Sequence, residues 1–360
     1  TMDNKGLLFI PDISGFTRFI NETEIEHSRY IIQELLEILI NANRLGLEIS
    51  EIEGDAILFY KFGAPPAMDE LYEQVQEMFY AFHRHLMNYD RSKYCQCMAC
   101  KRAIDLTLKV VTHYGEFAGY NVKNFNKLIG KDVIVAHQLL KNDIEQHEYW
   151  LVTKNLTPGE PPADPAKRIQ WMRQSKQTET GAIDFHYALL SQLKNDIPPE
   201  PSPQLQLTGY TKMLSFTREY ETDIITLFHG SGDFNYRHRW QEGVQKVEEV
   251  DHLLPRIGMR CRIVKDNGES MIYSSSYHYH PEHIEFSETN EQDNTVTYYT
   301  LEKVDEQRSR LTINMYVKKT LLGPLLFQLH QKRKLETMYN KSLDNLGALL
   351  KEIHLPALNQ

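Results

Sequence analysis

Two short stretches decide how the first half of the chain folds: residues 9–17, FIPDISGFT, and residues 51–56, EIEGDA. The first stretch overlaps an apolar run at residues 7–10, which predicts a buried strand. The second lies within residues 47–62, which are typical of two strands around a tight turn at Gly54. This half of the chain therefore begins as a sheet whose strands end in polar, glycine-containing turns.

A carboxylate pair is expected where these two stretches meet. Apolar residues at helical spacing over residues 30–45 predict one helical crossover, and strands joined in this way can lie side by side. Asp12 would then lie at a strand end and Asp55 at a hairpin tip. Two such carboxylates form a hard oxygen site that suits Mg²⁺ (or Mn²⁺) together with substrate phosphates. The structural alternative is that Asp12 caps the following helix and Asp55 only makes the turn.

The rest of the first half alternates helices and strands, which predicts a mixed α/β domain. A proline-rich loop is expected at residues 157–165, followed by a short helical stretch from Ala166. The predicted helices cover residues 68–87 and 131–141, and the predicted strands cover residues 104–112, 149–153 and 183–189.

The motifs of this half resemble those of class III nucleotidyl cyclases, the adenylyl and guanylyl cyclase catalytic domains. Residues 9–17 are similar to that family's first-strand motif, and residues 51–56 to its hairpin ending in Gly-Asp. Residues 113–116, HYGE, and 128–136, LIGKDVIVA, are similar to its later strand-end and dimer-side motifs, in the same order. The resemblance covers about residues 5–190 and implies a ferredoxin-like, cyclase-type α/β domain.

The resemblance also implies roles for individual residues. Asp12 and Asp55 match the two metal-binding aspartates, and the Ile13 carbonyl matches a backbone metal ligand. Glu51 and Lys127 match the two positions that select the purine. Glutamate at the first position is similar to the guanylyl-type choice, since a carboxylate accepts hydrogen bonds from guanine's ring N–H and amino group. Lysine at the second position fits neither usual pattern.

Two departures from the family pattern imply weak catalysis. The family's transition-state asparagine and arginine fall by spacing on Ile134 and Gln138. Isoleucine donates no hydrogen bond and glutamine carries no charge, whereas an arginine acting on a transferring phosphoryl group is worth about 10³–10⁵ in rate. The nearest match to the family's triphosphate-binding lysine is Lys176. We therefore expect a degenerate cyclase-like domain, a pseudoenzyme that binds a purine nucleotide, and the family's shared sites imply a homodimer.

Three cysteines, Cys95, Cys97 and Cys100, fall within six residues. Thiolates at this spacing can share one Zn²⁺, whose tetrahedral shell needs a fourth ligand. The alternative is a group of ordinary thiols in a reduced compartment. The histidines considered for the fourth position are His83, His85 and His113.

The second half has a different architecture. Four prolines within residues 197–204 predict a linker, so we place a cyclase-like domain at 1–195, a linker at 196–206 and a second domain at 207–360. The expected strands of the second domain, followed by a long helix at about residues 324–353, predict a curved antiparallel sheet around a long C-terminal helix. With Trp240-Gln-Glu-Gly243, this order resembles the START-like helix-grip fold (SRPBCC, polyketide cyclase-like).

The helix-grip resemblance implies a cavity for a small hydrophobic ligand between sheet and helix. Aromatic residues of this half could line it, and the alternative is that they simply form the core. The residues named for the cavity are Trp240, Tyr277 and Phe286. The whole chain is then of α+β class, with a cyclase-type α/β domain followed by a helix-grip domain.

Composition excludes several function classes. The 360 residues carry 40 Lys+Arg against 49 Asp+Glu, a net charge of −9, which disfavours nucleic-acid binding. No apolar run is long enough to span a membrane, and the N-terminal residues do not read as a signal peptide, so a cytoplasmic location is expected.

The predicted function is signalling. A catalytically impaired cyclase-like domain would bind a purine nucleotide with Mg²⁺, coupled to a domain that binds a small hydrophobic ligand. Two alternatives stay open: an active purine nucleotide cyclase that releases pyrophosphate, and a non-catalytic scaffold.

Overall fold

The computed structural model describes residues 4–23, 25–95, 97–161, 169–201, 204–319 and 325–355, and the side chains of 325–328 are outside that description. The chain divides into two compact units. The first comprises residues 1–91 and 96–200, and the second comprises residues 92–95 and 201–360. Both contain large sheets and helices, so the expected α+β class is confirmed. The domain limits expected from the prolines stay a prediction.

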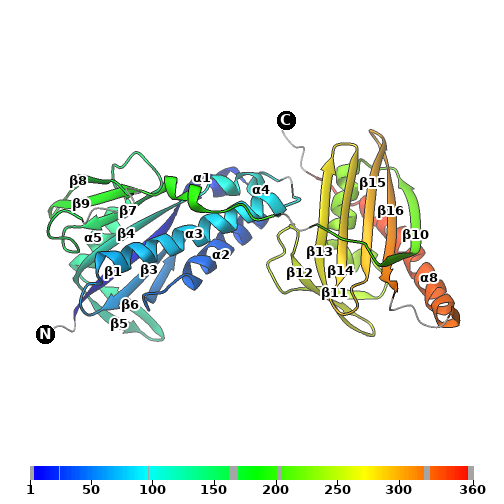
Figure 1. Ribbon diagram of the computed structural model, residues 1–360, viewed down its shortest axis with the longest axis horizontal. Helices are drawn as coiled ribbons and strands as arrows, with labels where there is room; N and C mark the ends of the chain where they lie inside the picture. The colour runs from blue at the N-terminus through cyan, green and yellow to red at the C-terminus, as the bar shows by residue number, and fades with distance from the viewer. Residues whose placement is uncertain are drawn as a thin grey trace. The chain divides into compact units, whose positions relative to one another are not determined.

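A seven-stranded sheet forms the centre of the first unit, in the order β2-β3-β1-β4-β7-β9-β8 (Figure 1). Only β4 and β7 pair in parallel, and the other neighbours are antiparallel. Every residue of β1 after Lys5 is buried, as its apolar run predicts. The strands are β1 (Lys5–Ser14), β2 (Glu48–Glu53), β3 (Ala56–Phe62), β4 (Thr107–Glu116), β7 (Tyr149–Thr153), β8 (Trp171–Thr178) and β9 (Gly181–Leu189).

Five helices and a small hairpin complete this unit in its described residues. Alternate residues of β1 point to opposite faces of the sheet, and Leu8 and Ile10 share a core with Val133, Ala136 and Leu139 of α5. The helices are α1 (Phe16–Glu22), α2 (Ile25–Asn41), α3 (Met68–Ser92), α4 (Met98–Arg102) and α5 (Lys131–Leu140), and the hairpin is β5 (Ala118–Val122) with β6 (Phe125–Ile129).

One local prediction for this unit fails where the structure describes it. The helical stretch expected from Ala166 falls partly on residues 162–168, which lie outside the described part of the chain, and its last residues, Trp171 and Met172, begin β8. β8 pairs with β9 along its whole length, from Trp171 with Ala188 to Thr178 with Gly181. Backbone pairing to a buried strand outweighs the weak helical preference of this segment.

The second unit is built on an antiparallel seven-stranded sheet in the order β10-β16-β15-β14-β13-β12-β11 (Figure 1). The first strand of this order, β10 (Tyr210–Tyr220), pairs with β16, the last strand in the described part of the chain. The others are β11 (Val244–Glu249), β12 (Arg260–Lys265), β13 (Gly268–His280), β14 (His283–Asn290), β15 (Val296–Asp305) and β16 (Arg308–Lys318). β11 has no counterpart among the predicted strands, since its alternation is largely polar.

The long helix α8 (Leu325–Leu350) packs on this sheet together with the short helices α6 (Ile224–Gly232) and α7 (Arg237–Trp240). Leu343 and Leu346 of α8 share one core with Leu311 and Ile313 of β16. Leu329 of α8 is 48% exposed, and the described packing of this helix against the core begins further along, at Leu335. Residue 324, where this long helix was expected to begin, lies outside the described residues.

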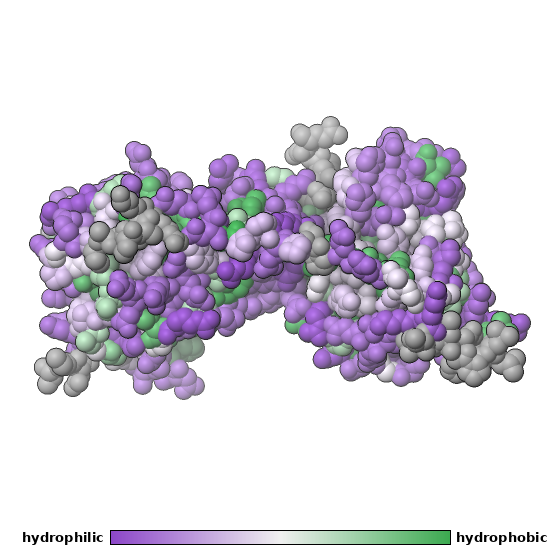
Figure 2. Space-filling view, viewed as in Figure 1, coloured by the Kyte–Doolittle hydropathy of each residue, from purple (hydrophilic) through white to green (hydrophobic). Residues whose placement is uncertain are grey.

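The face shown in Figure 2 is largely hydrophilic, with small hydrophobic groups between the polar side chains. Among the described helices, none combines the length and apolar character needed to cross a membrane.

Candidate functional site

Asp12 and Asp55 lie together at one end of the first sheet. Asp12 is opposite Ala56 in the pairing of β1 with β3, and the Ile13 N–H donates to the Asp55 carbonyl at 3.0 Å. The Asp55 carboxyl group is close enough to that of Asp12 to raise the Asp12 pKa. Asp12 does not cap the following helix: Gly15, at a φ of 86°, holds that position without a side-chain bond. Asp55 does occupy the turn between β2 and β3.

Lys109 brings a positive charge to this carboxylate pair. It lies opposite Asp12 in the register of β1 with β4, and its Nζ is 3.2 Å from Asp12 Oδ2 and 3.3 Å from the Leu140 carbonyl. Burial raises the pKa of Asp12 to about 7, while Lys109 lowers it and the neighbouring Asp55 raises it further. Lys109 was not among the site residues expected from the sequence. A lysine inside a strand of otherwise apolar character was the available signal.

The two positions expected to select a purine are paired with each other. The Lys127 ammonium of β6 donates to the Glu51 carboxylate of β2. This contact is the main cause that holds the pKa of Glu51 below its usual value and raises the pKa of Lys127. Glu53 and His137 of α5 lie alongside, with His137 Nδ1 3.8 Å from Glu53 Oε2. The Lys127 ammonium, a hydrogen-bond donor, and the Glu51 carboxylate, an acceptor, therefore lie side by side.

The positions that depart from the family pattern lie on or beside α5. Ile134 is 60% exposed on that helix. The Gln138 side-chain oxygen is buried, and no donor in the described part of the chain reaches it. Lys176, on β8, donates to the Lys141 carbonyl just after α5. Gln138 therefore offers a buried acceptor where the family pattern has a cation.

The last two motifs, HYGE and LIGKDVIVA, form one hydrogen-bonded unit. Asp132 accepts from the Glu116 N–H at 2.7 Å and contacts His113 Nε2 at 2.7 Å. His113 Nδ1 in turn lies 2.7 Å from Thr153 Oγ1. Burial alone would raise the pKa of Asp132, but these hydrogen bonds from His113 and Glu116 lower it. The network fixes the start of α5 against β4.

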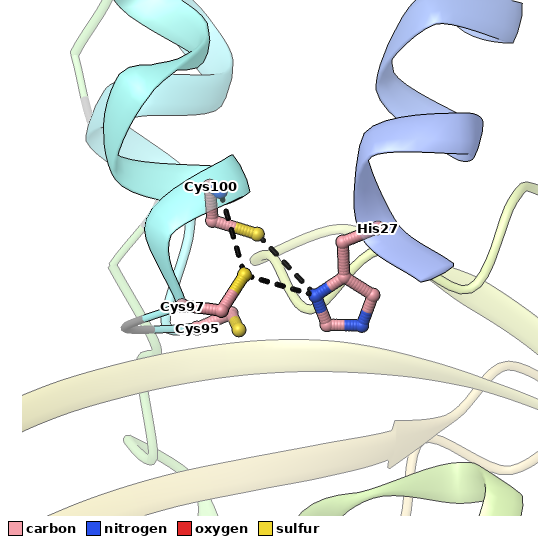
Figure 3. Close-up of side chains that lie close together, drawn as sticks. All are labelled: His27, Cys95, Cys97 and Cys100. Carbon is pink, nitrogen blue, oxygen red and sulfur yellow. Dashed lines mark hydrogen bonds between the residues drawn. The ribbon is translucent and has the colours of Figure 1, made fainter. Parts of the chain in front are cut away.

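The three clustered cysteines lie beside a histidine that was not expected from the sequence. His27 Nδ1 lies 3.4 Å from Cys97 Sγ and 3.5 Å from Cys100 Sγ (Figure 3). With Cys95, these residues offer four ligand atoms that all lie within 4.8 Å of one another. All four cysteines of the chain are described, and none forms a disulfide.

The three histidines expected to complete the cysteine cluster are engaged elsewhere, so that expectation is wrong. His83 contacts Glu148 at 2.5 Å, His85 contacts Glu34 at 3.0 Å, and His113 belongs to the Asp132 network. His27 lies 70 residues before Cys97, at the start of α2, and nothing in its local sequence marks it as a ligand.

In the second unit the residues named for a cavity lie in or against the core. Trp240 is 1% and Phe286 6% exposed, and Tyr277 packs against the same cluster. Phe286 stacks on Tyr299 at 4.5 Å between ring centroids. These contacts account for their burial by ordinary core packing. A buried Arg237–Glu288 ion pair, which the sequence analysis missed, lies beside the Trp240 ring.

The β5–β6 hairpin carries exposed apolar side chains on the face that holds Lys127. In its register Tyr120 is opposite Lys127 and Val122 is opposite Phe125, so these residues share one face with Ile129. Phe125 is 71% and Ile129 61% exposed, unusually high values for large apolar side chains grouped on one surface.

One family model and one curated relative each match part of the chain. Residues 32–149 match a family described as "Protein of unknown function (DUF2652)". The chain is also 32% identical over 129 residues to the uncharacterized protein Rv2561/Rv2562 of Mycobacterium tuberculosis (strain ATCC 25618 / H37Rv). That match covers 33% of this chain and 56% of the relative, so the chain spans little more than half of that protein's length.

Among solved structures, the chain is similar to guanylyl cyclase domains. One is that of the RhoGC fusion protein of the aquatic fungus Blastocladiella emersonii, at 15% identity and a TM-score of 0.35, covering 52% of this chain and 94% of that one. Another is the guanylate cyclase domain of RhGC from Catenaria anguillulae in complex with GTP, at 14% identity and a TM-score of 0.35. That match covers 52% of this chain and 96% of the cyclase domain. Because these TM-scores lie below 0.5, the case for a nucleotide site depends on this chain's own residues.

Proposed function

We propose that the first unit is a class III cyclase-like domain that binds a purine nucleotide with a divalent cation and catalyses cyclisation slowly or not at all. The observation that carries the proposal is the Asp12–Asp55 carboxylate pair, formed at the end of β1 by the two motifs that resemble the family's metal-binding motifs. The four family-like motifs occur in order, and the last two are hydrogen-bonded to each other through Asp132.

The donor set at this pair fits a hard divalent cation. Two carboxylates and a nearby backbone carbonyl, that of Ile13, are oxygen ligands of the kind that Mg²⁺ and Mn²⁺ prefer. Asp12 and Asp55 would hold the ion, which would neutralise phosphate charge when a nucleotide is bound. Lys109 already supplies one positive charge to Asp12, so a divalent cation has to compete with its ammonium.

The Glu51–Lys127 pair suits guanine better than adenine. Guanine's edge carries the O6 acceptor beside the N1–H and N2–H donors, so Lys127 could donate to O6 while Glu51 accepts two hydrogen bonds. Adenine offers only one acceptor, N1, and one donor group, N6, on the corresponding edge. Guanine therefore gains one hydrogen bond, and we propose GTP over ATP as the preferred ligand.

The same surroundings support impaired catalysis. Catalysis of phosphoryl transfer depends on charge placed at the transferring group, and an arginine there is worth about 10³–10⁵ in rate. Ile134 and Gln138 stand at the family's two stabilising positions and carry no charge. The Gln138 oxygen is a buried acceptor and suits a donor such as a ribose hydroxyl rather than a phosphate.

A homodimer is part of this proposal. The exposed apolar face of the β5–β6 hairpin lies on the same side as Lys127, so a partner covering it would also enclose the purine site. A second copy of the chain is the occupant that the family's shared sites imply.

For the second unit we propose a START-like helix-grip domain that binds a small hydrophobic ligand and acts with the first unit in signalling. Its support is the antiparallel sheet packed by α8 and the aromatic residues Trp240, Tyr277 and Phe286 in or against the shared core. Ligand entry would require these side chains to rearrange, since Tyr277 and Phe286 both pack against the Phe228 ring and Trp240 is buried in the same core.

Calorimetric titration of the full chain with non-hydrolysable GTP and ATP analogues, with and without Mg²⁺, tests the nucleotide proposal. We expect binding that needs Mg²⁺, favours the GTP analogue and is lost in Asp55→Ala but kept in the surface control Asp69→Ala. Absence of binding to either analogue would leave only the scaffold alternative. Pyrophosphate release with MgGTP, MgATP or their Mn²⁺ forms, abolished by Asp55→Ala, would instead establish an active cyclase.

A further inference from the structure

The strongest unassigned feature of the chain is the thiol–imidazole cluster, which we define as His27, Cys95, Cys97 and Cys100. Three soft thiolates and one imidazole form a Cys₃His set, a donor set of structural Zn²⁺ sites. Cys95 and Cys100 are buried, and His27 and Cys97 are half-buried. We propose that this cluster binds one structural Zn²⁺ ion, with His27 as the ligand that completes the shell.

The spacing of the ligand atoms matches a zinc tetrahedron. With Zn–S of about 2.3 Å and Zn–N of about 2.0–2.1 Å, a tetrahedral ion holds sulfur and nitrogen about 3.6 Å apart and two sulfurs about 3.8 Å apart. His27 Nδ1 is 3.4 Å from Cys97 Sγ and 3.5 Å from Cys100 Sγ. All four ligand atoms lie within 4.8 Å of one another, so an ion could join them with small side-chain movements (Figure 3).

The local backbone favours the thiolate form that zinc needs. Cys97 and Cys100 form a C-x-x-C pair at the start of α4, and the Cys100 N–H points to Cys97 Sγ at 3.4 Å. Hydrogen bonds to a charged group favour that charged form. Tyr89 Oη donates to Cys100 Sγ at 2.8 Å, and such a hydrogen bond to a metal ligand holds the ligand atom in its orientation.

The position of the ligands indicates a structural rather than a catalytic ion. Four protein ligands close the tetrahedral shell and leave no open position for substrate. His27 lies in the first turn of α2, and Cys97 and Cys100 lie at the start of α4, which packs against α2. The ion would therefore hold together the starts of two helices, α2 and α4, that are far apart in the sequence. The ligands lie in the first turn of α2 and in the segment that leads into α4, away from the end of β1 and the β2–β3 turn that carry Asp12 and Asp55, so the inference does not depend on the nucleotide proposal.

Binding is written as Zn²⁺ plus three Cys–SH and one neutral imidazole giving the Cys₃His complex and three protons. Because free cysteine has a pKa of about 8.5, all three protons are released to solvent near neutral pH. Zinc affinity should therefore rise with pH by up to about a thousandfold per unit until the thiols ionise.

Metal analysis of the full chain, expressed without a histidine tag and purified under reducing conditions, tests the inference. We expect about one zinc per chain and no iron. The Cys97→Ser/Cys100→Ser double variant should retain less than about a tenth of this, and His27→Asn should weaken Zn²⁺ binding by at least about a hundredfold. Cys261→Ser, a buried cysteine outside the cluster, and His278→Ala, an exposed histidine, are the matched controls and should keep full zinc.

A second measurement covers the case in which a variant does not fold. Zinc is removed from the wild-type chain by a chelator and Co²⁺ is added, and a tetrahedral thiolate complex should give visible d–d bands and a sulfur-to-cobalt charge-transfer band. Chelation should also lower the thermal midpoint, and added ZnCl₂ should restore it. A zinc content near zero without cobalt bands, iron in place of zinc, or zinc retained by the double-serine variant would each overturn the proposal.

Discussion

At the scale of single residues, Gly115 shows how closely the motif residues of the first unit pack. A Cβ at this position would lie 2.1 Å from Asp132 Cγ and 2.3 Å from one of its carboxylate oxygens. Asp132 cannot move aside without losing its hydrogen bonds to His113 and the Glu116 N–H. The glycine of HYGE is therefore required by the aspartate of LIGKDVIVA.

Gly115→Ala should destabilise the first unit by about 1–3 kcal/mol, the usual cost of forcing an extra methyl group into a filled site. Gly119→Ala is the matched control, because its Cβ would meet no atom within 4 Å, and its cost should be below about 0.5 kcal/mol. Denaturant midpoints of both variants and the wild type measure the difference. Equal stability of the two variants would contradict the packing of Asp132 on Gly115.

Asp12 should make the stability of the first unit depend on pH. Burial raises its pKa from 3.8 to about 7 in the folded chain, so between about pH 4 and 7 the folded state binds the proton that the unfolded state has lost. The free energy of unfolding contributed by Asp12 therefore falls as pH rises through this window, by an amount on the order of a few kcal/mol.

Denaturant unfolding of wild type and Asp12→Asn at several pH values measures this contribution, since the difference between the two isolates one group. The difference should fall between about pH 4 and 7 and be level outside that range. A difference that instead rose with pH would mean that Asp12 has a lowered pKa and is held as a carboxylate by Lys109.

At the scale of elements, β4 and α5 decide the charge at the carboxylate pair. Lys109 projects from β4 and connects Asp12 on β1 to the carbonyl of Leu140 at the end of α5. The ammonium therefore occupies a place that a divalent cation would also seek. Two unit charges about 4 Å apart near a protein surface interact by about 4 kcal/mol, so the competition is large.

Lys109→Met should tighten divalent cation binding by about tenfold or more, measured by titration with Mn²⁺ at several pH values. Because Lys109 lowers the pKa of Asp12, its loss raises that pKa, so the affinities are compared at pH values where the Mn²⁺ affinity of each protein no longer changes. Lys212→Met, an exposed lysine in the second unit, is the control and should leave the affinity unchanged. Weaker Mn²⁺ binding in Lys109→Met would show that Lys109 supports the site instead of competing for it.

The ion pair between Glu51 of β2 and Lys127 of β6 should set the purine preference. Glu51→Ala should weaken binding of the GTP analogue by about tenfold, since guanine loses its hydrogen bonds to the charged carboxylate. The exchanged variant Glu51→Lys/Lys127→Glu keeps the ion pair but reverses donor and acceptor, so it should favour the ATP analogue. Its fold should be intact, because the ion pair is retained and this part-buried pair lies near the surface. An unchanged preference for guanine in the exchanged variant would exclude this pair as the purine contact.

At the scale of the whole molecule, the exposed hairpin face should control self-association. Phe125→Asp places a charge among exposed apolar side chains. It should therefore favour the monomer and raise the dimer dissociation constant at least about tenfold. Val304→Asp, at an apolar position in the second unit that is 37% exposed, is the control. Sedimentation velocity of the full chain measures both. A wild type that stays monomeric at high concentration would rule out the homodimer.

Much of the secondary structure was readable because each element is decided by local pattern. The apolar run at Leu7 predicted β1, and Gly54 predicted the β2–β3 turn, where it adopts a φ of 60°. The same reasoning failed for β8 and β11, whose polar alternation becomes a strand only when a neighbouring strand supplies its hydrogen bonds. Strand pairing is a long-range contact, and a local pattern does not contain it.

The sequence by itself determined the strand end with Asp12, the turn with Asp55 and the three clustered cysteines, because each depends on neighbours a few residues away. Only the tertiary structure decided that Lys109 lies at Asp12, that Glu51 pairs with Lys127 across 76 residues, and that His27 reaches Cys97 across 70. Such contacts follow from sheet register and helix packing, which depend on the summed burial of many side chains. No single stretch of sequence records that sum, so the charges and ligands that define both candidate sites became apparent only in the folded chain.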